Sequence, residues 1–382
     1  MSFIFWSKCV IRSHYLVHSL KYISFGNRFA INWTHIKTSL KAVPTTNRCL
    51  TQIRHKCGVN EALNRRPKTL WSWNIISGLL VWLGIIEEPE DPLILTIKRG
   101  VYCMQCEEYS KAELILHSAL HMSQELAFES AETYVLDVLA NNYFKKGDYV
   151  RAEQVFKDVF NRVLAKGMAP NEEPIVEMSI KLSHIYSITG DVDKSDIGFD
   201  FCLTEQTKRV DGFRHKCCDD MTDEEINSMA LMGMCYDYYS KHLSSIGHFD
   251  KAIDSLTKAI DICLNINGRT HSQTLVLYND LSAIYVHKKD YENALVYMKK
   301  AIDGAVTTED KHLAKYYTNL GFVYLQRFEK DLALKWCTES LALILRAKDN
   351  DKETNRDKTK DRKLLEEKAR KCVADSTALR NQ

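Results

Sequence analysis

Two pairs of side chains have types and spacings that could do chemistry. Cys103 and Cys106 form a Cys-x-x-Cys pair, a spacing used in zinc sites and in thiol–disulfide exchange. No second pair completes a zinc site, and no strand is expected before this one, as a thioredoxin-like unit would require. His117 and His121 are one helical turn apart and could share a metal ion, but no acidic residue directly follows His117. We therefore predict no catalytic residue, no cofactor and no metal at these positions.

The other cysteines and histidines are scattered, so we expect most of them to be packing residues. Three cysteines stand where a helical pattern has small apolar side chains: Cys202, Cys263 and Cys337. Three histidines should be hydrogen-bonded within packed helices: His184, His271 and His312. Cys217 and Cys218 lie in a polar segment, where they could be oxidised or could be free thiols. The sequence contains no P-loop, no GxSxG motif and no HExxH motif, which argues against an enzyme.

The elements that would position these side chains are helices. From Leu93 onward, apolar residues recur with helical periodicity, and Gly and Pro are few. The pattern also repeats, and its clearest copy matches the 34-residue helix-turn-helix frame of a tetratricopeptide repeat. The matching residues are Leu136, Leu139, Ala140, Tyr143, Gly147, Tyr149, Ala152 and Phe156. Gly147 suits a turn with positive φ, and Ala152 is small because the two helices of a unit approach closely.

Small residues recur at the equivalent point of each second helix, where we expect the two helices of a unit to cross. They are Ala112, Ala152, Ser195, Ala252, Ala294 and Ala333. Their spacings are 40, 43, 57, 42 and 39 residues, and the longest interval contains an insertion at residues 204–223, expected to be a solvated loop or a helix extension. We predict an all-α fold, a tetratricopeptide-repeat superhelical solenoid of about six helix-turn-helix units over residues 87–347, preceded by a single membrane-anchor helix.

The segment before the repeats has the composition of a targeting signal. Residues 1–68 carry 12 Lys and Arg against one acidic residue, Glu61, which favours a mitochondrial transit segment over a disordered basic arm. Residues 69–86 are uncharged and include three tryptophans, so we predict a transmembrane anchor there. A buried packing helix and a surface-lying anchor are the alternatives. A spanning anchor would keep its basic flank in the matrix and place the repeats in the intermembrane space.

The repeat array has a predicted start and a predicted end. Asp91 and Pro92 form a helix start signal, an acceptor side chain followed by a residue without an amide hydrogen. Residues 348–382 form a charged tail. In this tail, residues 348–360 should be flexible, and Arg362 to Val373 could be a short capping helix or a frayed end.

The charge distribution argues against a nucleic-acid partner. After the leader, 40 basic and 49 acidic residues remain, whereas a phosphate-binding surface needs clustered Lys and Arg that release counterions. We therefore expect a protein partner, held by the first helix of each unit, because these helices line the concave side of such a solenoid. The residues whose register places them on that side are Tyr134, Asp137, Asn141, Glu177, His184, Asp237, Lys241, Asn279, Lys315 and Thr318.

Several segments go beyond the general repeat pattern. They read DPLILTIK at residues 91–98, AELILHSAL at 112–120, IKLSHI at 180–185 and LMGMC at 231–235. With the basic leader and the apolar segment, they make the chain resemble the mitochondrial tetratricopeptide repeat protein 19 family over about Asp91 to Arg346. The resemblance implies a mitochondrial inner-membrane factor without chemistry of its own. Such a factor associates with respiratory complex III and supports its assembly and upkeep, in part by helping to clear fragments of the Rieske iron-sulfur subunit.

A second hypothesis is a soluble adaptor of the kinesin light chain type. It is suggested by the repeat spacing of roughly 42 residues and by the polar connector GRTHSQT at residues 268–274. Such an adaptor would also bind proteins through the repeats, but it would lack the membrane anchor.

Overall fold

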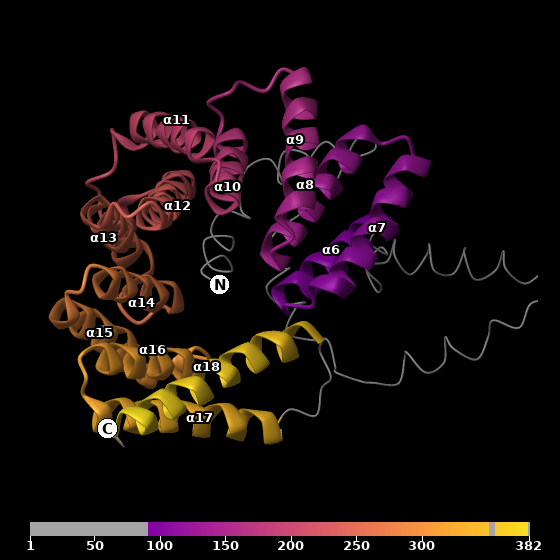
Figure 1. Ribbon diagram of the computed structural model, residues 1–382. Coiled ribbons are helices and arrows are strands. Elements are labelled where there is room, and N and C mark those ends of the chain that lie inside the picture. The colour runs from indigo at the N-terminus through magenta and orange to yellow at the C-terminus, as the bar shows by residue number, and fades with distance from the viewer. Residues whose placement is uncertain (1–90, 351–355, 381–382) are drawn as a thin grey trace, which may run out of the picture. The chain divides into compact units, whose positions relative to one another are not determined.

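The computed structural model describes residues 91–350 and 356–380, and all of these residues from Thr96 onward belong to one compact unit. Within this part of the chain the secondary structure is entirely helical and forms six consecutive pairs (Figure 1). The pairs are α6 Pro92–Gln105 with α7 Tyr109–Glu125, α8 Glu129–Lys146 with α9 Tyr149–Ala165, α10 Glu173–Thr189 with α11 Val192–Val210, α12 Asp223–Ser245 with α13 Phe249–Asn267, α14 Ser272–His287 with α15 Tyr291–Thr308, and α16 Leu313–Gln326 with α17 Lys330–Asn350. The prediction of an all-α array of about six units is confirmed.

In the second and third pairs, the turn between the two helices is set by a glycine and an aspartate. Gly147 ends α8 in the left-handed region at φ 80°, as its place in the sequence frame predicts, and Gly190 ends α10 at φ 86°. The next residue, Asp148, caps α9 by accepting a hydrogen bond from the backbone N–H of Arg151, and Asp191 caps α11 in the same way. A Gly-Asp dipeptide therefore closes one helix and opens the next.

The small residues lie where the two helices of a pair cross. All six predicted positions, from Ala112 to Ala333, have no exposed surface. At two crossings the helices are close enough for a serine hydroxyl of one helix to be hydrogen-bonded across the crossing: Ser195 Oγ donates to the carbonyl of Ser183 at 3.0 Å, and Ser282 Oγ donates to that of Ala294 at 2.8 Å. The absence of a bulky side chain at these points is what permits this approach.

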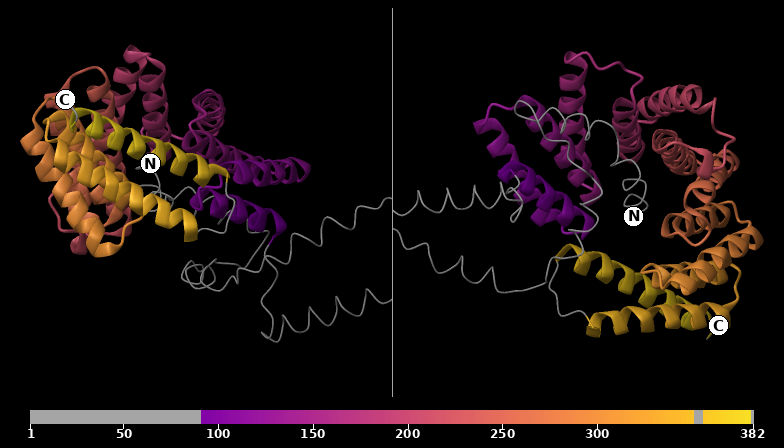
Figure 2. Two further views of the ribbon diagram at one scale, coloured as in Figure 1. Left: turned by 60° about the horizontal axis from the view of Figure 1, so that its bottom comes forward. Right: turned by 180° about the vertical axis from the view of Figure 1, so that it is seen from behind.

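The first and second helices of the pairs form two layers. Figures 1 and 2 show α10, α12, α14 and α16 along the inner side of the array, with α11, α13, α15 and α17 along the outer side. We call the surface formed by α8, α10, α12, α14 and α16 the first-helix face. All ten predicted partner-binding residues lie in these helices; seven are half-buried, and three are buried, namely Asp237, Asn279 and Thr318.

The insertion between the third and fourth pairs is packed rather than wholly solvated. Residues 204–210 extend α11, a short 3-10 helix follows at Cys218–Asp220, and Thr222 opens α12 with a capping box to Glu225. Val210 and Met221 join a buried cluster with Met229 and Met232, against which Phe213 also packs. The expected solvated loop is thus limited to about residues 211–217, and Cys217 in it is an exposed free thiol.

The carboxyl-terminal tail is more ordered than its composition predicts. Helix α18, Arg356–Arg380, packs against α17 and α16 and extends beyond both ends of the predicted capping helix. Residues 348–350 belong to α17 and residues 356–360 to α18, so the prediction of flexibility over 348–360 is wrong for these residues. Cys337 is buried as predicted, but it is not simply a packing residue, because it is paired in a disulfide with Cys372 of α18.

The start signal of the array behaves as predicted, since α6 begins at Pro92 and the Leu93 N–H donates to Asp91 Oδ1 at 2.7 Å. The predicted leader, residues 1–68, and the predicted anchor, residues 69–86, lie outside the described residues. Among the helices that the structure describes, none combines the length and apolar character needed to cross a membrane.

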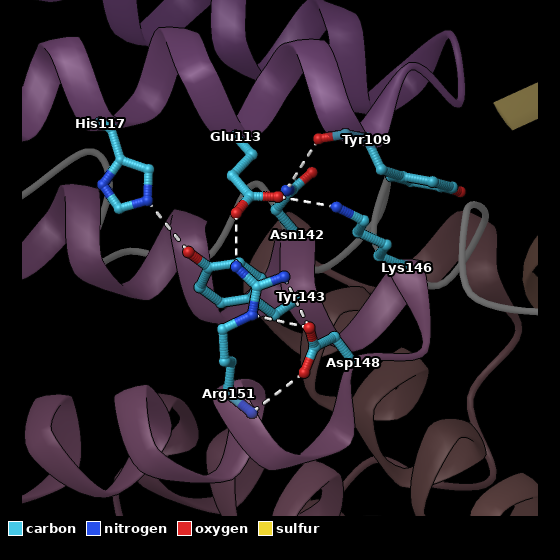
Figure 3. A network of polar contacts seen from close by, with 8 residues as sticks. All are labelled: Tyr109, Glu113, His117, Asn142, Tyr143, Lys146, Asp148 and Arg151. Atoms are coloured by element: carbon cyan, nitrogen blue, oxygen red, sulfur yellow. Dashed lines mark hydrogen bonds and ion pairs between the residues drawn. The ribbon is translucent and has the colours of Figure 1, made fainter. Parts of the chain in front are cut away.

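A network of charged side chains connects the first two pairs (Figure 3). Glu113 of α7 pairs with Lys146 of α8 at 2.8 Å and with Arg151 of α9 at 2.5 Å, and Arg151 also pairs with Asp148 at 2.6 Å. Nearby, Asn142 donates to the carbonyl of Tyr109 at 3.1 Å. Burial raises the pKa of Glu113, but the hydrogen bonds from Lys146 and Arg151 outweigh it and hold the pKa below its usual value.

This network predicts a pH-dependent contribution to stability. A carboxyl whose pKa is lower in the folded than in the unfolded chain stabilises the fold above its unfolded pKa of about 4.3, and this contribution is lost as the pH falls through the folded pKa. Glu113→Gln should therefore lower the free energy of unfolding by about 1–3 kcal/mol at pH 7, and by progressively less below pH ~4. Urea unfolding from pH 7 to pH 3 measures this. Asp254→Asn, which breaks an exposed pair with Lys258, is the control and should cost under ~0.5 kcal/mol; equal losses for both variants would contradict the prediction.

The close crossings predict a second, size-dependent effect. Ala152→Leu adds three carbon atoms at a crossing with no free space and should destabilise the array by about 1–3 kcal/mol through overpacking. Ala165, in the last turn of the same helix, is exposed, so Ala165→Leu should be nearly neutral. Thermal unfolding followed by circular dichroism compares the two. A Tm of Ala152→Leu at or above that of the Ala165 variant would mean that the crossing is not tightly packed.

Candidate functional site: the first-helix face

The amino-terminal half of the first-helix face carries a chain of polar contacts across two pairs. Lys181 of α10 is nearly fully buried and donates to Asn141 Oδ1 of α8 at 2.6 Å. It also pairs with Glu177 one turn earlier, at 2.5 Å. Asn141 in turn donates to Asp137 Oδ1 at 3.3 Å. Three of the predicted residues, Asp137, Asn141 and Glu177, are therefore brought together by a lysine that the sequence analysis did not select.

Two groups on this part of the face have shifted pKa values. Burial raises the pKa of Asp137 to about 6, although the nearby charge of Lys181 acts in the opposite direction. Burial and the charge of Lys181 lower the pKa of Lys145, at the end of α8, to about 8. A carboxyl and an amine whose pKa values both lie near neutral pH are sensitive to a charged partner, because binding such a partner can change their protonation.

The second polar group lies between α12 and α14. Asp237 is fully buried and pairs with Lys241 at 2.7 Å, and Lys241 also approaches Asp280 of α14 at 3.6 Å. Burial lowers the pKa of Lys241, but the attraction of Asp237 and Asp280 outweighs it, so the net shift is upward. Lys241 is thus held in its charged form between two carboxylates.

The polar contacts continue to α16 through a pair of amides. Asn319 Nδ2 of α16 donates to Asn279 Oδ1 of α14 at 2.7 Å, and Asn279 Nδ2 donates to Asp280 at 3.1 Å. Lys315 is half-buried one turn before Asn319. Thr318 lies elsewhere: it is 1% exposed, and its hydroxyl is 2.7 Å from Ser340 Oγ of α17, so it belongs to the contact between α16 and α17.

An aromatic cluster separates the two polar groups. The His184 ring of α10 lies 4.4 Å from the Tyr238 ring of α12 and 5.8 Å from the Phe144 ring of α8, measured between centroids. Burial, assisted by the charge of Lys241, lowers the pKa of His184 to about 3, so its imidazole is neutral at physiological pH. Its Nδ1 is buried and has no hydrogen-bond partner within the described residues. Tyr134 of α8 is half-buried on the same face.

The structure also shows which residues a reading of the sequence missed. Lys181, Asp280, Asn319, Phe144 and Tyr238 all belong to these clusters. Two of the contacts join residues 40 positions apart, Asn141 with Lys181 and Asn279 with Asn319, which is close to one repeat length. A search for hydrogen-bonding residues at repeat-equivalent positions of successive first helices would have found Lys181 and Asn319.

The pairs with chemical spacing have other surroundings: Cys103 is buried, and the two histidines are exposed. Cys103 is buried, and burial raises the pKa of its thiol, which opposes the thiolate that thiol exchange needs. His117 Nε2 lies 3.0 Å from the hydroxyl of Tyr143 (Figure 3), and His121 pairs with Glu125 at 3.4 Å. Within residues 91–350 and 356–380, no three metal-ligating side chains come together.

One Ser-His-Asp cluster does form, at the contact of α10, α11 and α12. His242 Nδ1 lies 2.9 Å from Ser187 Oγ and 3.1 Å from Ser195 Oγ, and Nε2 lies 2.8 Å from Asp196. The types match a hydrolytic triad, but Ser195 and His242 have no exposed surface and Ser195 donates its proton to a backbone carbonyl. A substrate has no access to these atoms, so we interpret the cluster as a polar connection between helices.

The comparisons with known proteins agree with the fold. A tetratricopeptide-repeat family model matches residues 239–305, from the end of α12 into α15. The protein named tetratricopeptide repeat protein 19, mitochondrial, from Rattus norvegicus is 32% identical over 241 residues, 63% of this chain and 66% of that protein. Its namesake from Homo sapiens is 31% identical over 63% of this chain and 64% of its own length. The chain thus spans just under two thirds of the length of these relatives.

Two solved structures share the fold at low sequence identity. A Rap protein complexed with competence and sporulation factor superposes with a TM-score of 0.52, at 14% identity over 71% of each chain. The apo form of the quorum sensor NprR from B. thuringiensis gives a TM-score of 0.51, at 13% identity over 98% of this chain and 91% of that one. At these identities the similarity shows the helical-repeat fold alone.

Removing one partner of the ion pair between Asp237 and Lys241 should cost more stability than removing both. Lys241→Met leaves the carboxylate of Asp237 buried without its cation and should cost about 1–3 kcal/mol or more of stability. The double variant Asp237→Asn with Lys241→Met removes both charges and should recover most of that loss. Chemical denaturation of the wild type, both single variants and the double variant gives the coupling energy. A coupling energy near zero would show that the pair contributes no net attraction.

Proposed function

Because the chain belongs to the mitochondrial tetratricopeptide repeat protein 19 family, we propose that it is a non-enzymatic scaffold of the mitochondrial inner membrane that binds respiratory complex III. The scaffold supports the assembly and upkeep of the complex, including the clearance of fragments of the Rieske iron-sulfur subunit. In this proposal, a polypeptide of the complex binds to the first-helix face, and the repeats catalyse no reaction themselves.

The observation that carries this proposal is the place of a family-like segment in the structure. The segment IKLSHI, residues 180–185, supplies both Lys181, which connects α8 with α10, and His184, the centre of the aromatic cluster. A segment on which the family resemblance rests thus contributes two side chains to the side of the array on which such solenoids hold their partners.

The predicted anchor, residues 69–86, would hold the first-helix face close to a partner in the same membrane. Confinement to the membrane raises the effective concentration of the scaffold near complex III, so weak contacts on the face suffice for association. In this proposal the anchor has its basic flank in the matrix, and the repeats face the intermembrane space.

The soluble adaptor of the kinesin light chain type is the second candidate. The mitochondrial names of the relatives favour the first function over it. A fluorescent fusion of the full chain discriminates between them, since a diffuse or microtubule-linked signal would support the soluble adaptor.

The experiment compares how much wild-type and variant protein associates with complex III, with one variant on the first-helix face and one on a second helix. The double variant Tyr134→Ala with Lys315→Glu changes two half-buried positions of the first-helix face. Lys299→Glu makes the same charge change on the exposed surface of the second helix α15 and is the control. We expect the wild type and the control to co-migrate with complex III in native gels of mildly solubilised mitochondria. The face variant should lose at least about tenfold in associated protein, the effect of removing one or two contacts of 1–2 kcal/mol.

Circular dichroism of each variant confirms that the helices are intact before association is compared. Absence of wild-type co-migration would reject complex III as the partner. Equal association of the face variant and the control would leave complex III in place but reject the first-helix face as its binding surface.

A further inference from the structure

Helix α18 packs against the array mainly through small side chains, beside the partly buried Val373. Ala369, Cys372 and Ser376 recur every three or four residues along it and have no exposed surface, while most of the helix is charged. Burying alanine, cysteine and serine removes little apolar area from water, so hydrophobic packing alone holds such a helix weakly. A helix of this composition needs a further interaction to stay docked.

The structure supplies that interaction as a sulfur–sulfur contact. Cys337 of α17 and Cys372 of α18 are both fully buried, and their Cα atoms are 5.8 Å apart, within the range of disulfides in proteins. The other cysteines of the described residues are free thiols. The pair is therefore specific to the contact between α17 and α18, which lie side by side in both views of Figure 2.

A glycine on α16 makes room for the two sulfurs. A Cβ atom added to Gly321 would overlap Cys337 Sγ and would come within 3.0 Å of Cys372 Sγ. Gly321 lies inside a helix, where glycine is less favourable than alanine by roughly 1 kcal/mol, so the position is better explained by packing than by helix formation. Three helices thus converge on one pair of sulfur atoms.

We propose that the mature protein carries Cys337 and Cys372 as a closed disulfide that fastens α18 over the last helix pair, and that reduction releases α18. Closure removes two protons and two electrons from the two thiols and forms one S–S bond. The electron acceptor is the disulfide of a thiol oxidoreductase, which is reduced to two thiols through a mixed-disulfide intermediate.

The proposal also constrains the compartment of the repeats, and in this respect it rests on the proposed function. Protein disulfides persist where thiols are kept oxidised and are rare where glutathione and thioredoxin keep them reduced, as in the cytosol. A closed Cys337–Cys372 bond fits repeats that face an oxidising space and does not fit the soluble cytosolic adaptor.

The test reads the thiols of the full chain directly. Isolated mitochondria are denatured in N-ethylmaleimide, and the chain is digested and analysed by mass spectrometry with and without a later reducing step. We expect Cys337 and Cys372 to escape the first alkylation, to appear as one linked peptide pair, and to gain two labels after reduction. Cys263, which is buried and not in a disulfide, and the exposed Cys217 are internal controls and should be labelled at once. Complete initial labelling of Cys337 and Cys372, or linkage of either to a different cysteine, would overturn the proposal.

Two variants test the fastening itself. Limited trypsin digestion should cut α18 faster in Cys372→Ser than in the wild type, and a reductant should accelerate cutting of the wild type but not of the variant. Cys263→Ser, at another buried cysteine, should behave as the wild type does. Gly321→Ala should lower the disulfide fraction, whereas Gly212→Ala, where a Cβ meets nothing, should not. Unchanged cutting of α18 after reduction would show that the bond does not hold the helix. None of these readouts depends on complex III, so they can fail or succeed independently of the proposed partner.

Discussion

The close crossing of two helices at a small residue is the constraint on which the rest of the structure depends. At Ala152, Ala252 and Ala294 a side chain of ordinary size would push the helices apart, and the next pair would then stack on a different surface. Because every pair crosses in the same way, the first helices fall on one layer and the second helices on the other. The alignment of polar side chains along the first-helix face follows from that repetition.

The first-helix face contains two polar groups and, between them, an aromatic cluster. Its polar groups, around Lys181 and around Lys241, connect neighbouring pairs and therefore contribute to the rigidity of the array. The aromatic cluster of Phe144, His184 and Tyr238 lies between them, and because Phe144 and Tyr238 are buried, it also packs neighbouring pairs together. In the proposed function, the same face serves both recognition and internal cohesion. Variants on this face consequently need a stability measurement beside every binding measurement.

The sequence predicts the features that recur in every unit, but it does not predict the contacts that occur only once. Helical periodicity and the small crossing residues predicted six units, and register placed Asp137, Asn141 and Glu177 on one surface, because these signals recur at each unit. Lys181 was missed because its contact with Asn141 joins residues one repeat apart in the chain. The contacts of Cys337 with Cys372 and of His242 with Asp196 depend on how three helices meet, which no local pattern encodes. Thr318 has the register of a residue on the first-helix face, but it is buried, and its hydroxyl contacts Ser340 of α17.

The hydrogen bonds that already join the polar side chains of the first-helix face have a kinetic consequence. An incoming polypeptide must exchange contacts such as Asn279 with Asn319 for contacts of its own, so each new bond replaces an existing one and the net gain is small. A surface of this kind gives short residence times rather than permanent capture. Short residence suits a factor that visits many copies of a large assembly in turn, and it requires no external energy source for release.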